Sequence, residues 1–135
     1  MRSSILFITV ALFCFINLST QQVAGGYQNL TNAQVYGSKD ARGALNYGAK
    51  RITQIAVAAN KIPNYVYSVS KLLSAQEQVV AGMNYKFHAY ISDAKNRTLL
   101  DSNYTVYQNL NGTYSLSQWR YKILKGAKKP VKKTL

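Results

Sequence analysis

The chain has 135 residues, with 17 lysines and arginines against 4 aspartates and glutamates, and a formal net charge of +13 at pH 7. One domain is expected at this length. With one histidine and four carboxylates, few groups are available for acid–base catalysis, whereas the charge favours anionic partners.

The first 20 residues predict a secretory signal peptide. Arg2 precedes an apolar run from Ile5 to Ile16, which is followed by the small polar pair Ser19-Thr20. The run is too short for a membrane span, so we expect cleavage near Thr20-Gln21, with Ala24-Gly25 as the rival site. The secreted, extracellular product would lack Cys14, the sole cysteine, and would keep 16 basic and 4 acidic residues, a formal +12.

A helix is predicted after the paired glycines Gly25-Gly26. Ser38 is the expected N-cap, and Asp40 suits the positive end of the helix dipole. Apolar residues then recur every three or four positions, which predicts one buried face. These residues are Ala41, Leu45, Ala49, Ile52, Ile55 or Ala56, and Ala59. Gly43 and Gly48 are expected to weaken the helix, and Pro63 marks its end or lies just beyond.

The period changes to two after Pro63, which predicts strands. Alternating runs occupy residues 65–69, with strand formers returning at 78–80, then residues 85–91, 104–107 and 114–124. Asn111-Gly112 is a strong hairpin signal between the last two runs. The sequence therefore predicts an α+β fold, with one helix packed across a four- to five-stranded antiparallel sheet. The domain is expected to span residues 21–124, followed by a basic, disordered tail at 125–135.

The remaining polar residues suggest modification rather than chemistry. His88 lies in a strand pattern, and no carboxylate pair, phosphate loop or His/Cys cluster has a catalytic or metal-binding spacing. We expect neither an enzyme nor a cofactor or metal. Four Asn-x-Thr sequons begin at Asn29, Asn96, Asn103 and Asn111, and the apparent turns at Asn96 and Asn111 are the better glycosylation candidates.

One apolar, uncharged stretch lies between two predicted strands: Gln78-Val79-Val80-Ala81-Gly82. It completes the pattern Gln-x-Val-x-Gly, follows an amphipathic helix, and shares the chain with a glycine pair near the N-terminus. In this combination, over residues 23–124, the sequence resembles the cystatin family. The continuation Met83-Asn84-Tyr85 is similar to cystatins as well.

The resemblance implies a cystatin-like fold and reversible, competitive inhibition of papain-like cysteine proteases of the cathepsin type. Cystatins insert a wedge made of an N-terminal arm and two hairpins into the protease cleft. The implied contact residues are Val23, Ala24, Gly25, Gly26, Gln78, Val79, Val80, Ala81, Gly82, Asn109 and Leu110. An uncharged tip leaves little polar surface stranded in an apolar cleft, and Gly82 permits either a positive φ or a close approach to the enzyme.

The sequence departs from the family pattern in the second hairpin. That turn usually carries Pro-Trp, whereas here it reads Gln108-Asn109-Leu110-Asn111-Gly112. An alternative alignment places Gln118-Trp119 at the loop instead of on the last strand. The disulfides of many secreted cystatins are also absent, because Cys14 is the only cysteine.

A different role for the same fold is the alternative hypothesis. The charge and the lysine-rich tail would suit a cationic antimicrobial, toxin-like or glycosaminoglycan-binding protein with little protease inhibition, the tail binding an anionic polysaccharide or membrane surface. No nucleic-acid-binding motif is present, so no specific nucleic-acid partner is expected. We expect a monomer.

Overall fold

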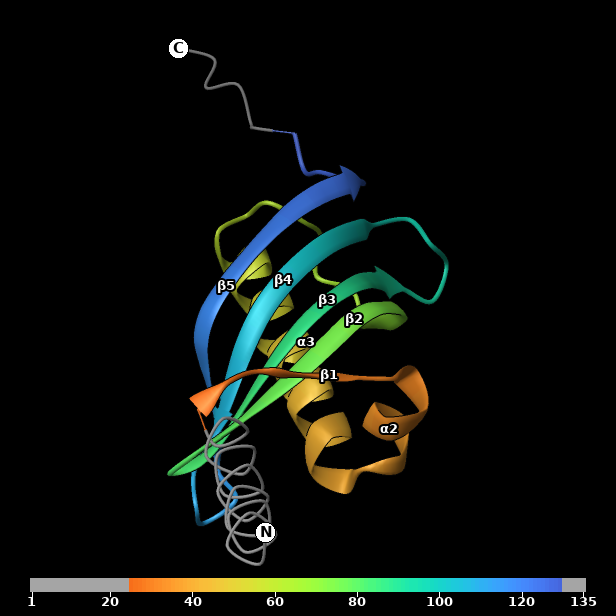
Figure 1. Cartoon of the computed structure of the whole chain (residues 1–135). Helices are drawn as coiled ribbons and strands as arrows, with labels where there is room; N and C mark the ends of the chain where they lie inside the picture. The colour runs from red at the N-terminus through yellow and green to blue at the C-terminus, as the bar shows by residue number, and fades with distance from the viewer. Residues whose placement is uncertain (1–24, 130–135) are drawn as a thin grey trace, which may run out of the picture.

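The structure is a computed structural model that describes residues 25–129. Its strands form one antiparallel sheet of five strands in the order β1-β2-β3-β4-β5, and the helix α3 lies across one face of that sheet (Figure 1). The elements are β1 (Gln28–Leu30), α2 (Asn32–Gly37), α3 (Lys39–Ala58), β2 (Tyr67–Val80), β3 (Gly82–Asp93), β4 (Leu99–Gln108) and β5 (Tyr114–Lys125). The predicted α+β fold is confirmed, with five strands.

The helix α3 begins where the sequence predicts. Ser38 is its N-cap, and the hydroxyl of Ser38 accepts a hydrogen bond of 3.2 Å from the amide of Ala41. The predicted apolar stripe faces the sheet, and Ala56 is the buried member of the pair Ile55/Ala56. The helix ends at Ala58, so Ala59 is its exposed C-cap and not a core residue, contrary to the prediction.

The core lies between α3 and the inner face of the sheet. Its largest fully buried side chains include Leu45 and Ile52 from α3, Phe87 and Ile91 from β3, and Leu100 and Val106 from β4. The buried Tyr104 hydroxyl donates a 2.7 Å hydrogen bond to the carbonyl oxygen of Leu45. This bond satisfies the one polar atom of a ring that is otherwise packed among apolar groups.

Gly48 allows the helix to approach the sheet closely. A Cβ at this position would collide with the ring of Tyr104 and crowd Val106. The glycine therefore costs helix propensity, as the sequence predicts, but it makes room for a tyrosine that joins α3 to β4.

Two short elements precede α3 that the sequence did not predict. The strand β1 pairs with residues 75–77 of β2. The helix α2 begins with a capping box, in which Thr31 Oγ1 accepts from the Gln34 amide and Gln34 Oε1 accepts from the Thr31 amide. Val35 anchors α2 in the core, where it is fully buried.

The strand β2 is longer than its sequence pattern suggests. It runs without a break over 14 residues, although the alternation of apolar and polar residues stops after Val69. Irregularities in its pairing with β3 lie between Val69 and Lys71 and between Leu72 and Ser74. Each such bulge shifts the alternation of inward and outward side chains by one residue. The middle of the strand therefore lacks the regular two-residue period by which a strand is recognised in a sequence.

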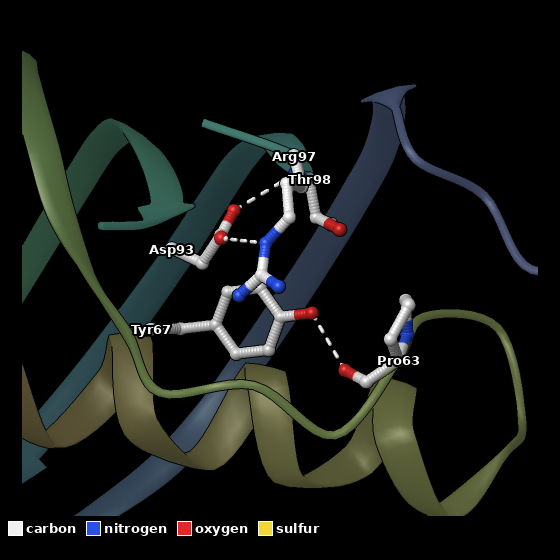
Figure 2. Close-up of polar contacts among 5 residues, drawn as sticks. All are labelled: Pro63, Tyr67, Asp93, Arg97 and Thr98. Atoms are coloured by element: carbon white, nitrogen blue, oxygen red, sulfur yellow. Dashed lines mark hydrogen bonds and ion pairs between the residues drawn. The ribbon is translucent and has the colours of Figure 1, made fainter. Parts of the chain in front are cut away.

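Hydrogen bonds close the turn between β3 and β4, and another joins the start of β2 to the segment that follows α3. Asp93 accepts hydrogen bonds from Arg97 Nε at 2.8 Å and from the Thr98 amide at 2.9 Å, and the Tyr67 hydroxyl donates to the Pro63 carbonyl at 2.6 Å (Figure 2). Although burial acts to raise it, the hydrogen bonds from Arg97 and Thr98 lower the pKa of Asp93 to about 2.

The chain after β5 returns to the same region. The Lys128 amide donates to the Lys61 carbonyl at 2.8 Å, and Lys128 Nζ donates to Asn60 Oδ1 at 2.6 Å. The start of the basic segment thus contacts the loop after α3, while residues 130–135 lie outside the described part of the chain. No helix within residues 25–129 is long and apolar enough to cross a membrane.

Candidate functional site

The apolar stretch forms the tip of the β2–β3 hairpin. Val80 pairs with Gly82 across the turn, which leaves Ala81 at the tip. The side chains of Val79 and Val80 are 46% and 40% exposed, so two large apolar groups face solvent where turns are usually polar.

Gly82 and Tyr107 fix the shape of this tip. Gly82 has φ +108°, and a Cβ on it would collide with the carbonyl oxygen of Gln108. The sequence predicted a glycine here for either a positive φ or a close approach to the enzyme. The positive φ is present, and Gly82 also lies close to β4 of its own chain. The Tyr107 hydroxyl donates a hydrogen bond to the carbonyl oxygen of Ala81. Because the hydrogen bond from Tyr107 already restrains the tip, the tip loses little conformational entropy on binding.

The β4–β5 turn lies beside that tip, at the same end of the sheet (Figure 1). Asn109 organises it: its side-chain oxygen accepts from the amides of Asn111 at 3.0 Å and Thr113 at 2.9 Å, and its carbonyl accepts from Gly112 at 2.9 Å. Leu110 is 84% exposed at the apex. The hairpin predicted from Asn111-Gly112 is confirmed, and the apex carries an aliphatic side chain.

Trp119 lies on β5 and not at this turn. It is opposite Tyr104 in the pairing of β4 with β5, and it is 46% exposed. The alternative alignment that puts Gln118-Trp119 at the loop is therefore wrong.

The arm enters at the same end. Gln78 Nε2 donates a 3.0 Å hydrogen bond to the carbonyl oxygen of Gly25, while Gln78 Oε1 accepts from Asn84 Nδ2 at 3.0 Å. Lys86 Nζ lies 4.5 Å from the centre of the Tyr27 ring, a cation–π contact. The glutamine of the motif thus joins the arm to the hairpin. Val23 and Ala24 lie outside the described residues.

The structure therefore brings together Gly25 and Gly26, residues 79–82 and residues 109–112, here called the hairpin end. A groove runs between the two turns, lined by Asp40, Val79, Val80, Gly82, Met83, Gln108, Asn109, Leu110, Asn111 and Gly112. Asp40 is the carboxylate in this groove, and Gln108 Nε2 donates to it at 3.1 Å. That bond fixes the start of α3 against the second hairpin.

Sequence reasoning did not find the supporting residues of the hairpin end. Tyr107 bonds the β2–β3 turn, Gln108 bonds α3, and Asn84 bonds the neighbouring strand β2. Such partners become visible only once the strand register and the packing of the helix are known. Two signals were available in the sequence: Asn84 continues the motif, and Gln108 lies just before the second turn.

Within residues 25–129 no group of three or more histidine, cysteine or acidic residues could hold a metal ion. His88 Nε2 lies 2.6 Å from Asp101 Oδ1 on the sheet, away from the hairpin end, so the histidine is satisfied by a neighbouring side chain. What the hairpin end presents is a rigid, mostly uncharged surface suited to contact another molecule.

A family model described as the cystatin domain matches residues 49–120. The chain belongs to the cystatin family. The fold agrees, because the crystal structure of dimeric human cystatin F superimposes with a TM-score of 0.59 over 74% of this chain and 88% of that one, at 11% sequence identity. No curated protein sequence matches the chain. Cystatins as a family are inhibitors and not enzymes.

Proposed function

We propose that this cystatin is a secreted, monomeric, reversible and competitive inhibitor of papain-like cysteine proteases of the cathepsin type. The exposed pair Val79–Val80 on a fixed turn carries the proposal. Two apolar side chains on a turn with no charged residue would enter an apolar cleft without leaving a buried charge unpaired. The protease supplies the reactive cysteine, so none is needed here.

The other contacts follow from the same docking. Leu110 would take the place of the aromatic anchor of the second hairpin, and Gly25–Gly26 would let the arm pass the catalytic cysteine. In this proposal Val23 and Ala24 fill substrate side-chain subsites, and Asn109 shapes the second turn. Gln78 has mainly a positioning role, because its side-chain nitrogen and oxygen are both hydrogen-bonded within the chain, to Gly25 and to Asn84.

Inhibition of papain and of a cathepsin L-like enzyme by the chain from Gln21 tests the proposal. Val80→Asp places a charge at the tip and is expected to weaken inhibition by roughly 100-fold or more, since burying an unpaired charge costs several kcal/mol. Val66→Asp is the matched control: Val66 is 90% exposed and immediately precedes β2, at the end of that strand remote from the tip, so its replacement should leave the inhibition constant unchanged. Gly82→Glu is a poor test, because a side chain there collides with Gln108 and distorts the hairpin itself.

Absence of inhibition by a folded wild-type sample would refute the proposal and favour the cationic alternative. Equal loss in Val80→Asp and Val66→Asp would instead show that the tip is not the contact.

A further inference from the structure

The outer face of the sheet, opposite α3, is polar and basic. Successive residues of a strand point to opposite faces, so the outer residues of β3 are those between the buried Phe87, Ala89 and Ile91. Antiparallel partners share a face, which extends the set across the sheet. In one row Lys71, Tyr90, Asp101 and Lys122 follow one another from β2 to β5, and in the next Ser74, His88, Asn103 and Arg120.

Positive charge on this face is nearly unopposed. Lys71, Lys86, Arg120 and Lys122 are exposed there. Asp101 is the one carboxylate of these rows, and its Oδ1 is already bonded to His88 at 2.6 Å. The other three carboxylates of the chain lie elsewhere: Asp40 on α3, Asp93 buried at the β3–β4 turn, and Glu77 opposite the buried Tyr85.

Three of these basic residues, Lys86, Arg120 and Lys122, line two adjoining hollows. One is lined by Lys86, Asn103, Tyr104, Thr105, Gln118, Trp119 and Arg120, and the other by Asp101, Asn103, Arg120, Tyr121 and Lys122. Asn103 and Arg120 belong to both, so the hollows form one shallow trough along β4 and β5. Arg120 and Lys122 are two residues apart on one strand, which spaces their charges by about 7 Å along the trough.

We propose that this trough binds a sulfated polysaccharide. Guanidinium and ammonium groups form charge-assisted hydrogen bonds with sulfate oxygens, and the amides of Asn103 and Gln118 can bond sugar hydroxyls between them. The site is separate from the hairpin end and does not depend on protease inhibition.

The pattern of aromatic residues favours polysaccharide over nucleic acid. Single-stranded nucleic acids bind by stacking bases on exposed rings. Tyr104, Trp119 and Tyr121 line the trough but lie in rows shared with core residues, and Tyr90, which lies in an outer row, is not part of the trough lining. The outer rows along the trough thus carry cations and amides rather than a series of aromatic rings on which bases could stack.

Binding of heparin oligosaccharide to the protein recovered from the medium of expressing cells tests this inference. In buffer of about 0.15 M salt, where exposed charges more than about 8 Å apart are screened, Arg120→Gln/Lys122→Gln is expected to weaken binding by roughly tenfold or more, because two hydrogen bonds to charged groups are lost. Lys50→Gln/Arg51→Gln on the exposed side of α3 removes the same two residue types and should change the affinity by less than about threefold. Thermal unfolding confirms that both variants are folded.

Three results would overturn the assignment. Equal losses in the two double variants would mean that net charge alone attracts heparin. Complete loss on removal of residues 130–135 would move the site to the tail. Equally tight binding of a DNA oligonucleotide, weakened to the same extent by Arg120→Gln/Lys122→Gln, would make the trough a general polyanion or nucleic-acid surface.

Discussion

At the scale of single residues, Gly48 shows how the value of a residue depends on its contacts. In an exposed helix, glycine to alanine usually adds up to about 1 kcal/mol of stability. Here Gly48→Ala is expected to lower the free energy of unfolding by about 1–3 kcal/mol, because its methyl group meets the Tyr104 ring in a close-packed core. Urea denaturation measures this change.

Gly37 provides the control for that prediction. It ends α2, and a Cβ there would meet nothing within 4 Å. Gly37→Ala should therefore be neutral or stabilising. If Gly48→Ala were also neutral or stabilising, the Tyr104 ring would not pack against α3 as closely as described.

Asp93 makes the stability of the fold depend on acidity. Its pKa is about 2 in the folded protein against an ordinary 3.8, so the ionised form stabilises the fold above about pH 4, and this contribution is lost as the pH falls toward 2. Asp93→Asn is expected to be less stable at neutral pH and to show a shallower fall in unfolding free energy between about pH 4 and 2. Chemical denaturation at a series of pH values measures both.

Arg97→Gln should give a partial version of this result, since it removes one of the two groups that bond Asp93 and leaves the Thr98 amide. A wild-type pH profile in both variants would contradict the assigned role of the cluster.

At the scale of elements, the second hairpin depends on the side chain of Asn109. Asn109→Ala removes the side-chain oxygen that accepts from two backbone amides, and it is expected to cost about 1–2 kcal/mol of unfolding free energy. Asn111→Ala, two residues away, loses an exposed side chain and should cost less than about 0.5 kcal/mol. Both variants are compared in protein made without glycosylation, and equal costs would show that the turn does not rest on Asn109.

Some elements could be predicted from the sequence and others could not, for physical reasons. The helix α3 and the hairpin at Asn111-Gly112 carry long or specific signals, and both were predicted. The strand β1 has three residues and α2 has six, too few for a hydrophobic period, although the Thr31-x-x-Gln34 capping box was readable. In the candidate site the exposed tip could be predicted from its motif. Its supports could not, because Tyr107 bonds the turn of a neighbouring hairpin and Gln108 bonds α3, contacts that the folded arrangement alone defines.

At the scale of the whole molecule, charge repulsion opposes folding. Residues of one sign dominate the chain, with 17 basic against 4 acidic. Raising the salt concentration from about 0.01 to 0.15 M shortens the screening length from about 30 to 8 Å. We therefore expect the melting temperature to rise over this range, in contrast to a fold held mainly by surface ion pairs. A fall measured by calorimetry would contradict this.

The course of the chain after β5 has a practical consequence. Lys128 is bonded to Asn60 and Lys61 at the far end of α3, whereas both hairpin turns lie at the opposite end of the sheet (Figure 1). A tether joined to the chain beyond Lys128 would follow a point that is bonded to the body of the protein at the end opposite the turns. Coupled to a bead or biosensor chip in that way, every copy would present Val80 and Leu110 to the surrounding solution, whereas coupling through the arm would bury them against the support.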